Sequence, residues 1–242
     1  MGITQLNFEG KNKVEVAIEF IRAFEPPEGY YVAFSGGKDS VVIYDLVMKS
    51  GVKFNAHYNV SPIDPPELWR FIKEQYPLVQ WDNYAKHFWS MVVKKGLPMR
   101  QSRWCCQVIK EAGGEGRVVV LGNRREEGTI RKHQKCFERH RKGKKMFLRP
   151  ILDWNFGEVW EYIKTNSLPY CSLYDEGFKR LGCVLCPFAR NTKQEIARFP
   201  KIANLWLLAC NHLVEYRLTS GKEYKHQFKT GQELFDWWVS RK

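Results

Sequence analysis

Segments typical of β-strands and of α-helices alternate through the first 122 residues of this 242-residue chain. The apolar, β-branched runs that indicate buried strands lie at 30–34, 52–60, 78–81 and 117–121. The stretches with helical spacing of apolar residues lie at 12–24, 41–48, 65–76, 87–95 and 103–112. This alternation predicts an α/β fold, a parallel twisted sheet with helices on both faces. Ligands of such sheets bind at the carboxyl ends of the strands.

One polar stretch follows the first strand and opens the helix after it, with the sequence Ser35-Gly36-Gly37-Lys38-Asp39-Ser40. The glycines allow close approach of the backbone to a ligand. The free N–H groups of a first helical turn favour an anion, and Lys38 adds positive charge. The stretch therefore predicts a phosphate-binding loop, with an ordinary strand-to-helix turn and a capped helix as the alternative.

The same six residues resemble the pyrophosphate-binding loop of the ATP-pyrophosphatase (adenine nucleotide alpha-hydrolase-like) superfamily. Members bind ATP at this loop and release pyrophosphate after they adenylate a substrate. The resemblance implies that residues 35–40 bind nucleotide phosphates, that Lys38 is catalytic, and that Asp39 helps to place Mg²⁺. The spacing differs from that of a Walker A loop.

Two pairs of cysteines are candidate metal ligands. Cys105 and Cys106 are adjacent, and Cys183 and Cys186 form a C-x-x-C pair. Four thiolates suit tetrahedral zinc or an iron–sulfur cluster. Adjacent cysteines are unusual at zinc because their side chains diverge, whereas a cubane cluster accepts thiolates from more divergent directions. The alternative is that all four are small buried apolar residues.

The spacing of these cysteines, two adjacent and then 76 residues before the C-x-x-C pair, resembles the [4Fe–4S] motif of the APS/PAPS reductase (sulfonucleotide reductase) family. The flanking sequences at 149–154, 159–163, 168–170, 173–178 and 182–187 also resemble that family, and the likeness runs from about residue 28 to 190. It implies a [4Fe–4S] cluster on Cys105, Cys106, Cys183 and Cys186. It also implies nucleotide phosphate or sulfonate binding by Gly122, Arg124, Arg125 and Arg131, with Arg124 and Arg125 among the catalytic residues.

Two departures separate this chain from the reductases of that family. Reductases have a degenerate pyrophosphate loop, whereas residues 35–40 keep the ATP-pyrophosphatase form. Reductases also carry a nucleophilic cysteine in a C-terminal tail, whereas no cysteine follows Cys210 here. The sequence thus resembles most the iron–sulfur pyrophosphatase branch, of the DNA phosphorothioation type. We expect an ATP pyrophosphatase acting in sulfur transfer. The alternatives are a reductase that releases sulfite from APS or PAPS, and a nucleotide- or nucleic-acid-binding module with a structural cluster.

The segment 123–145 carries ten Lys and Arg against three Glu, a net +7 within a chain of net charge +13. A charge run of this kind is often a solvated loop. Its place after the strand at 117–121 favours nucleotide contact for Arg124, Arg125 and Arg131, and leaves nucleic acid (DNA or tRNA) as a partner for the remaining cations. Cys136 within it is either a persulfide carrier or a bystander.

The remaining expectations concern organisation and location. We expect a nucleotide-binding domain over residues 1–150 and a C-terminal segment with the C-x-x-C loop and helices over 151–242, together one compact unit. No run of about 18 apolar residues predicts a membrane helix, and residues 1–10 lack a signal-peptide pattern, so we expect a cytoplasmic protein with reduced cysteines. Cys210 is expected in the core, and Cys171 near the cluster. Expected partners are a sulfur donor such as a cysteine desulfurase or thioredoxin, and a second copy of the chain in a homo-oligomer.

Overall fold

The computed structural model describes residues 2–6, 10–140, 144–189, 191–220 and 227–240. Six strands among these residues form one sheet in the order β3-β2-β1-β4-β6-β5. Their bounds are β1 (Tyr30–Ala33), β2 (Phe54–Asn59), β3 (Gln80–Asp82), β4 (Val118–Val120), β5 (Phe137–Arg139) and β6 (Met146–Leu148). All neighbouring pairs are parallel except β5 with β6. The predicted α/β fold with a mostly parallel sheet is therefore confirmed.

The helices before residue 122 lie where the periodicity of the sequence predicts them, whereas α6 lies in the basic segment. Their bounds are α1 (Lys13–Ala23), α2 (Lys38–Ser50), α3 (Pro66–Gln75), α4 (Phe88–Lys95), α5 (Trp104–Ile109), α6 (Thr129–Lys132), α7 (Phe156–Thr165), α8 (Thr192–Arg198), α9 (Pro200–Thr219) and α10 (Gly231–Ser240), with short 3₁₀ turns η1 (Arg125–Glu127) and η2 (Ser172–Tyr174). The stretch 192–219 forms two helices, because Pro200 lacks an N–H and occupies the first turn of α9. The helical C-terminal part is confirmed, and no described helix is long and apolar enough to cross a bilayer.

The described residues form two compact units, each assembled from separate parts of the chain. The first unit comprises residues 1–59, 66–82 and 112–181 and holds the whole sheet. The second comprises residues 60–65, 83–111 and 182–242. The functional division at residue 150 that the sequence suggests stays a prediction.

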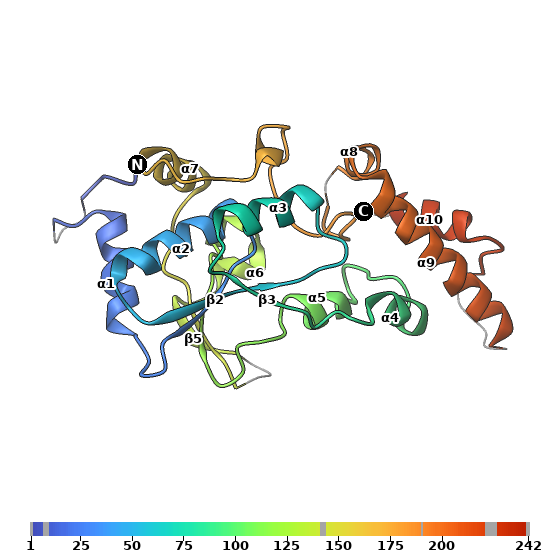
Figure 1. The fold of residues 1–242 in the computed structure, drawn as a ribbon, viewed down its shortest axis with the longest axis horizontal. Helices are drawn as coiled ribbons and strands as arrows, with labels where there is room; N and C mark the ends of the chain where they lie inside the picture. The colour runs from blue at the N-terminus through green and yellow to red at the C-terminus, as the bar shows by residue number, and fades with distance from the viewer. Residues whose placement is uncertain (1, 7–9, 141–143, 190, 221–226, 241–242) are drawn as a thin grey trace. The chain divides into compact units, whose positions relative to one another are not determined.

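In the first unit, β1 leads directly into α2 and fixes the position of the polar loop between them. Val32 and Phe34 are buried, and Phe34 packs against Tyr44 of α2 with ring centroids 5.6 Å apart. Tyr76, which follows α3, contacts Tyr44 at 5.2 Å. Figure 1 shows α2 and α3 along the same side of the strands. This packing holds both ends of the loop at the carboxyl end of β1.

The hairpin of β5 and β6 is the part of the sheet that the sequence did not predict. Glu138 of β5 lies opposite Phe147 of β6, and the pairing is antiparallel. β5 forms the edge of the sheet, where charged residues are common because they discourage pairing with another chain. The many cations of this segment hide the alternation of apolar residues, so the sequence pattern favours a basic loop there. Arg141 and Lys142 of that run lie outside the described residues.

The second unit has a core of aromatic residues from three helices. Trp206 of α9 and Trp238 of α10 are both buried, with ring centroids 4.7 Å apart. Phe88 of α4 packs edge-on against Trp206 at 5.7 Å. Cys210 is fully buried in α9, which confirms its predicted place in the core. This unit also holds all four cysteines predicted to bind metal.

Candidate functional site

The loop of residues 35–40 opens α2 with its backbone N–H groups at the carboxyl end of the sheet. Gly37 is the N-cap residue and makes no side-chain hydrogen bond to the helix, because it has no side chain. The N–H of Lys38, the first residue of the helix, donates to the hydroxyl of Tyr174 at 2.9 Å. The positive end of the helix dipole therefore lies at a loop without a carboxylate cap, an arrangement that suits an anionic ligand.

Hydrogen bonds of Ser35 and Ser40 stabilise the conformation of this loop. The N–H of Ser35 donates to Oγ of Ser40 at 3.2 Å, and Oγ of Ser40 donates to the carbonyl of Gly37 at 2.8 Å. The two hydroxyl oxygens lie 3.3 Å apart. These bonds fix the loop's conformation before any ligand binds, which reduces the entropy that binding must remove.

Glycine is required at two positions around the loop. Gly36 has φ +69°, and a Cβ there would lie 2.6 Å from Cδ1 of Leu68 in α3. Gly122 follows β4, the strand beside β1, and a Cβ there would lie 2.9 Å from the carbonyl oxygen of Asp39. Two chain segments that emerge from adjacent parallel strands thus approach each other with no room for a side chain.

Three charged residues form one network at the start of α2. Nζ of Lys38 lies 2.7 Å from one carboxylate oxygen of Asp39, and Nε of Arg124 lies 2.7 Å from the other. Lys38 and Arg124 are both buried, at 5% and 2% exposure. Burial works to lower the pKa of Arg124, but the pairing with Asp39 and the bond to Glu126 outweigh it and raise that pKa. Arg124 therefore remains a cation beside the loop.

The network bears on Mg²⁺, which ATP chemistry would bring to this site. Each carboxylate oxygen of Asp39 already contacts a cation, Lys38 or Arg124. An ionised carboxylate has about four acceptor positions, so these two contacts leave others open on Asp39. The role of Asp39 in placing Mg²⁺ stays a prediction.

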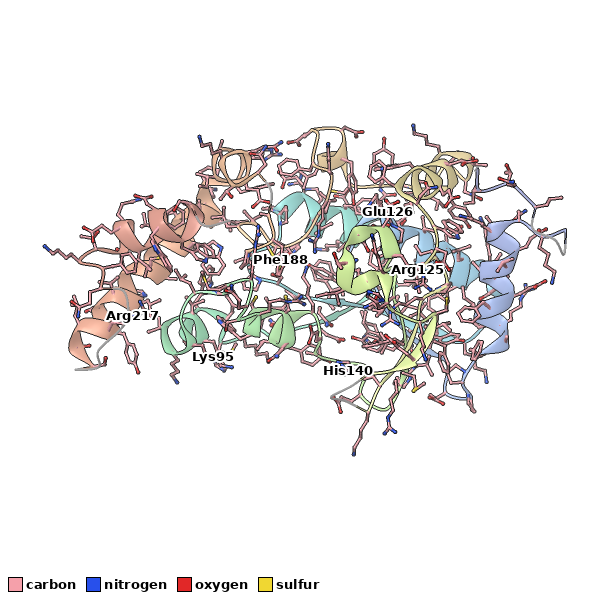
Figure 2. The ribbon with its side chains drawn as sticks, turned by 180° about the vertical axis from the view of Figure 1, so that it is seen from behind. Lys95, Arg125, Glu126, His140, Phe188 and Arg217 are labelled. Atoms are coloured by element: carbon pink, nitrogen blue, oxygen red, sulfur yellow. The ribbon has the colours of Figure 1, made fainter. Side chains whose placement is uncertain are left out.

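The other two predicted arginines bind their own segment of chain. Nε of Arg125 lies 2.5 Å from Oδ1 of Asp153, and its Nη1 donates to the carbonyls of Lys132 and Gln134, each at 2.8 Å. Arg131 in α6 pairs with Glu127 one helical turn earlier. Figure 2 shows Arg125 together with Glu126 on the segment that carries η1 and α6. These guanidinium groups order the segment after β4, and direct phosphate contact by them stays a prediction.

Tyr174 and Phe156 contact the loop, and sequence reasoning missed both. Tyr174 accepts the bond from Lys38 described above, and the ring centroid of Phe156 lies 5.4 Å from Nζ of Lys38. Both lie in flanking stretches that resemble the family, at 173–178 and just after 149–154. Membership in these stretches was the available signal, but nothing in their spacing indicates contact with a loop more than a hundred residues earlier in the chain.

Two cations in or beside the basic segment, Lys145 and Arg149, are buried at the hairpin of β5 and β6. The guanidinium of Arg149, which is buried, lies 2.9 Å from Oε1 of Glu138 in β5, and its Nη1 donates to the carbonyl of Lys135 at 2.8 Å. Lys145 is also buried, at 6% exposure. The half-buried Cys136 lies at the start of this hairpin, and burial is the main cause that raises its pKa. A raised pKa disfavours the thiolate that sulfur transfer would require.

All four predicted metal ligands belong to the second unit. Cys105 and Cys106 lie in the first turn of α5, and Cys183 and Cys186 flank a loop in which the N–H of Val184 donates to the carbonyl of Ile63 at 2.7 Å. A hydrogen bond from Cys105, with help from Lys110 and Arg103, lowers the pKa of Cys106 to about 6, and the same bond raises the pKa of Cys105. Burial raises the pKa of Cys183 to about 12.

Their donor chemistry suits a thiolate-bound cluster. Among the described residues, no group of three or more His, Cys, Asp or Glu is placed to hold a metal ion. The cluster on these cysteines therefore stays a prediction. Cys171, buried beside η2, belongs to the first unit, and its expected place near the cluster also stays a prediction.

Comparison with known protein families gives one matching domain. The model described as "Phosphoadenosine phosphosulfate reductase domain" matches residues 29–189, well over half of the chain. The matched range contains the loop, the segment after β4 and all four paired cysteines.

Proteins with similar sequences carry different names, as three relatives show. An uncharacterized protein of Methanocaldococcus jannaschii is 31% identical over 72% of this chain and 46% of its own length. A "Probable FAD synthase" of Schizosaccharomyces pombe is 31% identical over 72% of this chain and 67% of its own. An adenosine 5'-phosphosulfate reductase of Lysinibacillus sphaericus is 27% identical over 75% and 84%. The chain spans less than half the length of the archaeal relatives.

Two solved structures share the fold. A phosphoadenylyl-sulfate reductase from Candida auris superposes with a TM-score of 0.55 at 17% identity, covering 75% of this chain and 98% of that one. A Candida glabrata FMN adenylyltransferase superposes with a TM-score of 0.52 at 19% identity, covering 76% and 72%. At these identities the likeness concerns the fold alone.

Proposed function

This chain belongs to the phosphoadenosine phosphosulfate reductase domain family, and from that premise we propose that it is an adenine-nucleotide-dependent enzyme that uses ATP and releases pyrophosphate. The nucleotide phosphates would bind residues 35–40, and an acceptor group would be adenylated. The single observation that carries this proposal is the start of α2, where an uncapped glycine turn and Lys38 meet at the carboxyl end of the sheet.

The charges of the site favour the release of pyrophosphate. In the proposed reaction, a nucleophilic atom of the acceptor forms a bond to the α-phosphorus of ATP. The bond from that phosphorus to the oxygen bridging to the β-phosphate breaks, and its electron pair leaves with pyrophosphate. Negative charge grows on the leaving group, and the N–H groups of the loop, Lys38 and Arg124 are fixed donors that would stabilise it. Among the relatives, the protein named "Probable FAD synthase" supports adenylyl transfer.

The alternative is reduction of a sulfonucleotide with release of sulfite. The family description and the relative named adenosine 5'-phosphosulfate reductase favour it. That reaction needs a thiol to take the sulfonate sulfur, and the loop of residues 35–40 alone does not supply one. Cys136, whose pKa is raised by burial, is poorly suited because its thiolate is disfavoured.

We further propose that Cys105, Cys106, Cys183 and Cys186 hold a [4Fe–4S] cluster. Such a cluster supplies a redox-active centre when it is bound. These residues come from two distant parts of the sequence, so a shared cluster would tie α5 to the 183–186 loop within the second unit. A sulfur-donor protein and a nucleic-acid acceptor are the partners that fit a role in sulfur transfer.

Labelled ATP tests the proposed function directly. Purified protein is incubated with Mg²⁺ and ATP that carries the label either at the α- or at the γ-phosphate, without acceptor and with DNA or tRNA added. Adenylyl transfer predicts γ-label in pyrophosphate and α-label in AMP or in the acceptor. Parallel reactions with APS or PAPS and reduced thioredoxin measure sulfite. Sulfite without pyrophosphate would establish the reductase instead, and a protein inert in both assays would be a binding module.

A further inference from the structure

The hydroxyl of Tyr174 occupies a defined position at the proposed phosphate site. It accepts the N–H of Lys38, the first residue of α2, at 2.9 Å. It also lies 3.5 Å from the place where a Cβ on Gly37 would be. The phenol thus lies against the turn whose backbone N–H groups we assign to the nucleotide phosphates. A phosphate oxygen bound at this turn would lie within reach of the same hydroxyl.

A tyrosine hydroxyl that accepts one hydrogen bond keeps its own proton for donation. Among the described residues, no hydrogen bond uses the proton of the Tyr174 hydroxyl. Burial is the largest cause that raises the pKa of Tyr174, so the phenol stays protonated and neutral at physiological pH. The N–H of Lys38 is occupied by the phenol oxygen, so the phenol O–H is the donor that this contact leaves open to an anion.

The ring of Tyr174 is held in place by its neighbours. It packs edge-on against Trp160 of α7, with centroids 5.1 Å apart and planes at 90°. The N–H of Tyr174 donates to the carbonyl of Cys171 at 3.1 Å, and its carbonyl accepts the N–H of Gly177 at 3.1 Å. A donor fixed in this way needs little reorganisation when charge develops on the ligand.

We propose that Tyr174 is a pyrophosphate-binding residue of this enzyme, which donates its phenolic hydrogen to an oxygen of the phosphates held at the start of α2. This inference rests on the proposed function, because it assumes that phosphates bind at residues 35–40. Tyr174 is the last residue of the short turn η2 and lies 136 residues after Lys38. The proposal therefore gives this turn a direct role in binding the pyrophosphate that leaves. The opposite possibility is that the phenol blocks the turn and must leave before phosphate enters.

Titration calorimetry with inorganic pyrophosphate and with AMP tests the inference. Tyr174→Phe removes one oxygen and keeps the ring that packs on Trp160. Tyr170→Phe is the matched control, because it removes a hydroxyl that bonds to Asp175 at 3.1 Å on the same stretch of chain. Tyr174→Phe is expected to bind pyrophosphate about tenfold more weakly, the usual size for a hydrogen bond to a charged group, and AMP unchanged. Tyr170→Phe is expected to match the wild type with both ligands, and thermal melts check that both variants are folded.

The outcomes separate this inference from the proposed function. If the wild type binds pyrophosphate and Tyr174→Phe binds it equally well, Tyr174 has no role and the proposed function stands. Tighter binding by Tyr174→Phe would show that the phenol blocks the turn, which also overturns the inference. If the wild type neither binds pyrophosphate nor releases it from ATP, both proposals fall together.

Discussion

The guanidinium of Arg124 donates to the carboxylate of Asp39 at 2.7 Å, and this bond joins the segment after β4 to the first turn of α2. Arg124 is almost fully buried and also pairs with Glu126, so its removal takes a cation out of a buried charge network. Arg124→Ala is expected to lower the free energy of unfolding by about 3 kcal/mol, the size typical of a broken buried pair. Urea denaturation followed by tryptophan fluorescence measures the loss.

A surface ion pair provides the control for this prediction. Lys11 and Glu19 lie 2.6 Å apart, but their side chains are 37% and 52% exposed. Glu19→Ala should therefore change the free energy of unfolding by about 0.5 kcal/mol or less. An equally small effect of Arg124→Ala would show that the buried network contributes nothing to stability.

Lys38→Ala is expected to weaken ATP binding by about tenfold or more, because it removes a fixed cation from the proposed phosphate site. Lys49→Ala, at the other end of α2, removes a cation that pairs with Asp45 at 2.8 Å away from the loop. Calorimetry at two salt concentrations compares the two variants with the wild type. Equal affinity of Lys38→Ala and the wild type would refute the phosphate role of Lys38.

The sequence predicted the parts of the fold and site whose signals are local. The buried runs of β1 and β4 consist of neighbouring apolar residues, and the loop before α2 is one continuous string. The position of Arg124 beside the loop follows from its place just after β4, because the carboxyl ends of parallel strands share one edge of a sheet, while its nucleotide contact stays a prediction.

The missed features depend on contacts between distant residues. Tyr174 reaches Lys38 across 136 residues, and nothing in the short string around it indicates that contact. The β5–β6 hairpin was missed because the cations of an edge strand mask its pattern. Arg125 pairs with Asp153 rather than with a ligand. This pairing also depends on the folded chain, and the spacing of residues in the sequence does not indicate it.

Gly122→Ala should disturb the loop without changing its charge. A Cβ at Gly122 would lie 2.9 Å from the carbonyl oxygen of Asp39, so either α2 or the segment after β4 must shift. We expect weaker nucleotide binding, by about tenfold, together with a lower melting temperature. Gly128→Ala is the control, because a Cβ there meets nothing within 4 Å. Nucleotide affinity that is unchanged in Gly122→Ala would show that this close approach does not matter for binding.

Stability at alkaline pH should depend on Tyr162. Its hydroxyl lies 2.5 Å from Oδ2 of Asp45, and burial, followed by this bond, raises the pKa of Tyr162. Below the unfolded-state value of about 10, the phenol is protonated in both states and its contribution to stability is complete. Above that pH the unfolded chain loses the proton first, so stability falls as pH rises toward the folded-state pKa.

Denaturation curves between pH 8 and pH 11.5 check this dependence. In Tyr162→Phe the fall in unfolding free energy above about pH 10 should be shallower than in the wild type, by about 1.4 kcal/mol per pH unit. The exposed Tyr216 serves as the control, and Tyr216→Phe should follow the wild-type curve. Parallel curves for all three proteins would contradict the raised pKa.

Iron content provides the most direct test of the paired cysteines. Protein purified without oxygen and reconstituted with iron and sulfide should be brown and hold about four irons per chain, as a cubane cluster does. Cys183→Ser should lose most of the iron and the visible absorbance, because one of four thiolate ligands is gone. Cys136→Ser should keep both, since Cys136 belongs to the first compact unit and not to the unit that holds the four cysteines. A colourless wild type with one bound zinc would replace the cluster with a zinc site, and a wild type without metal would leave these cysteines as thiols of the helical unit.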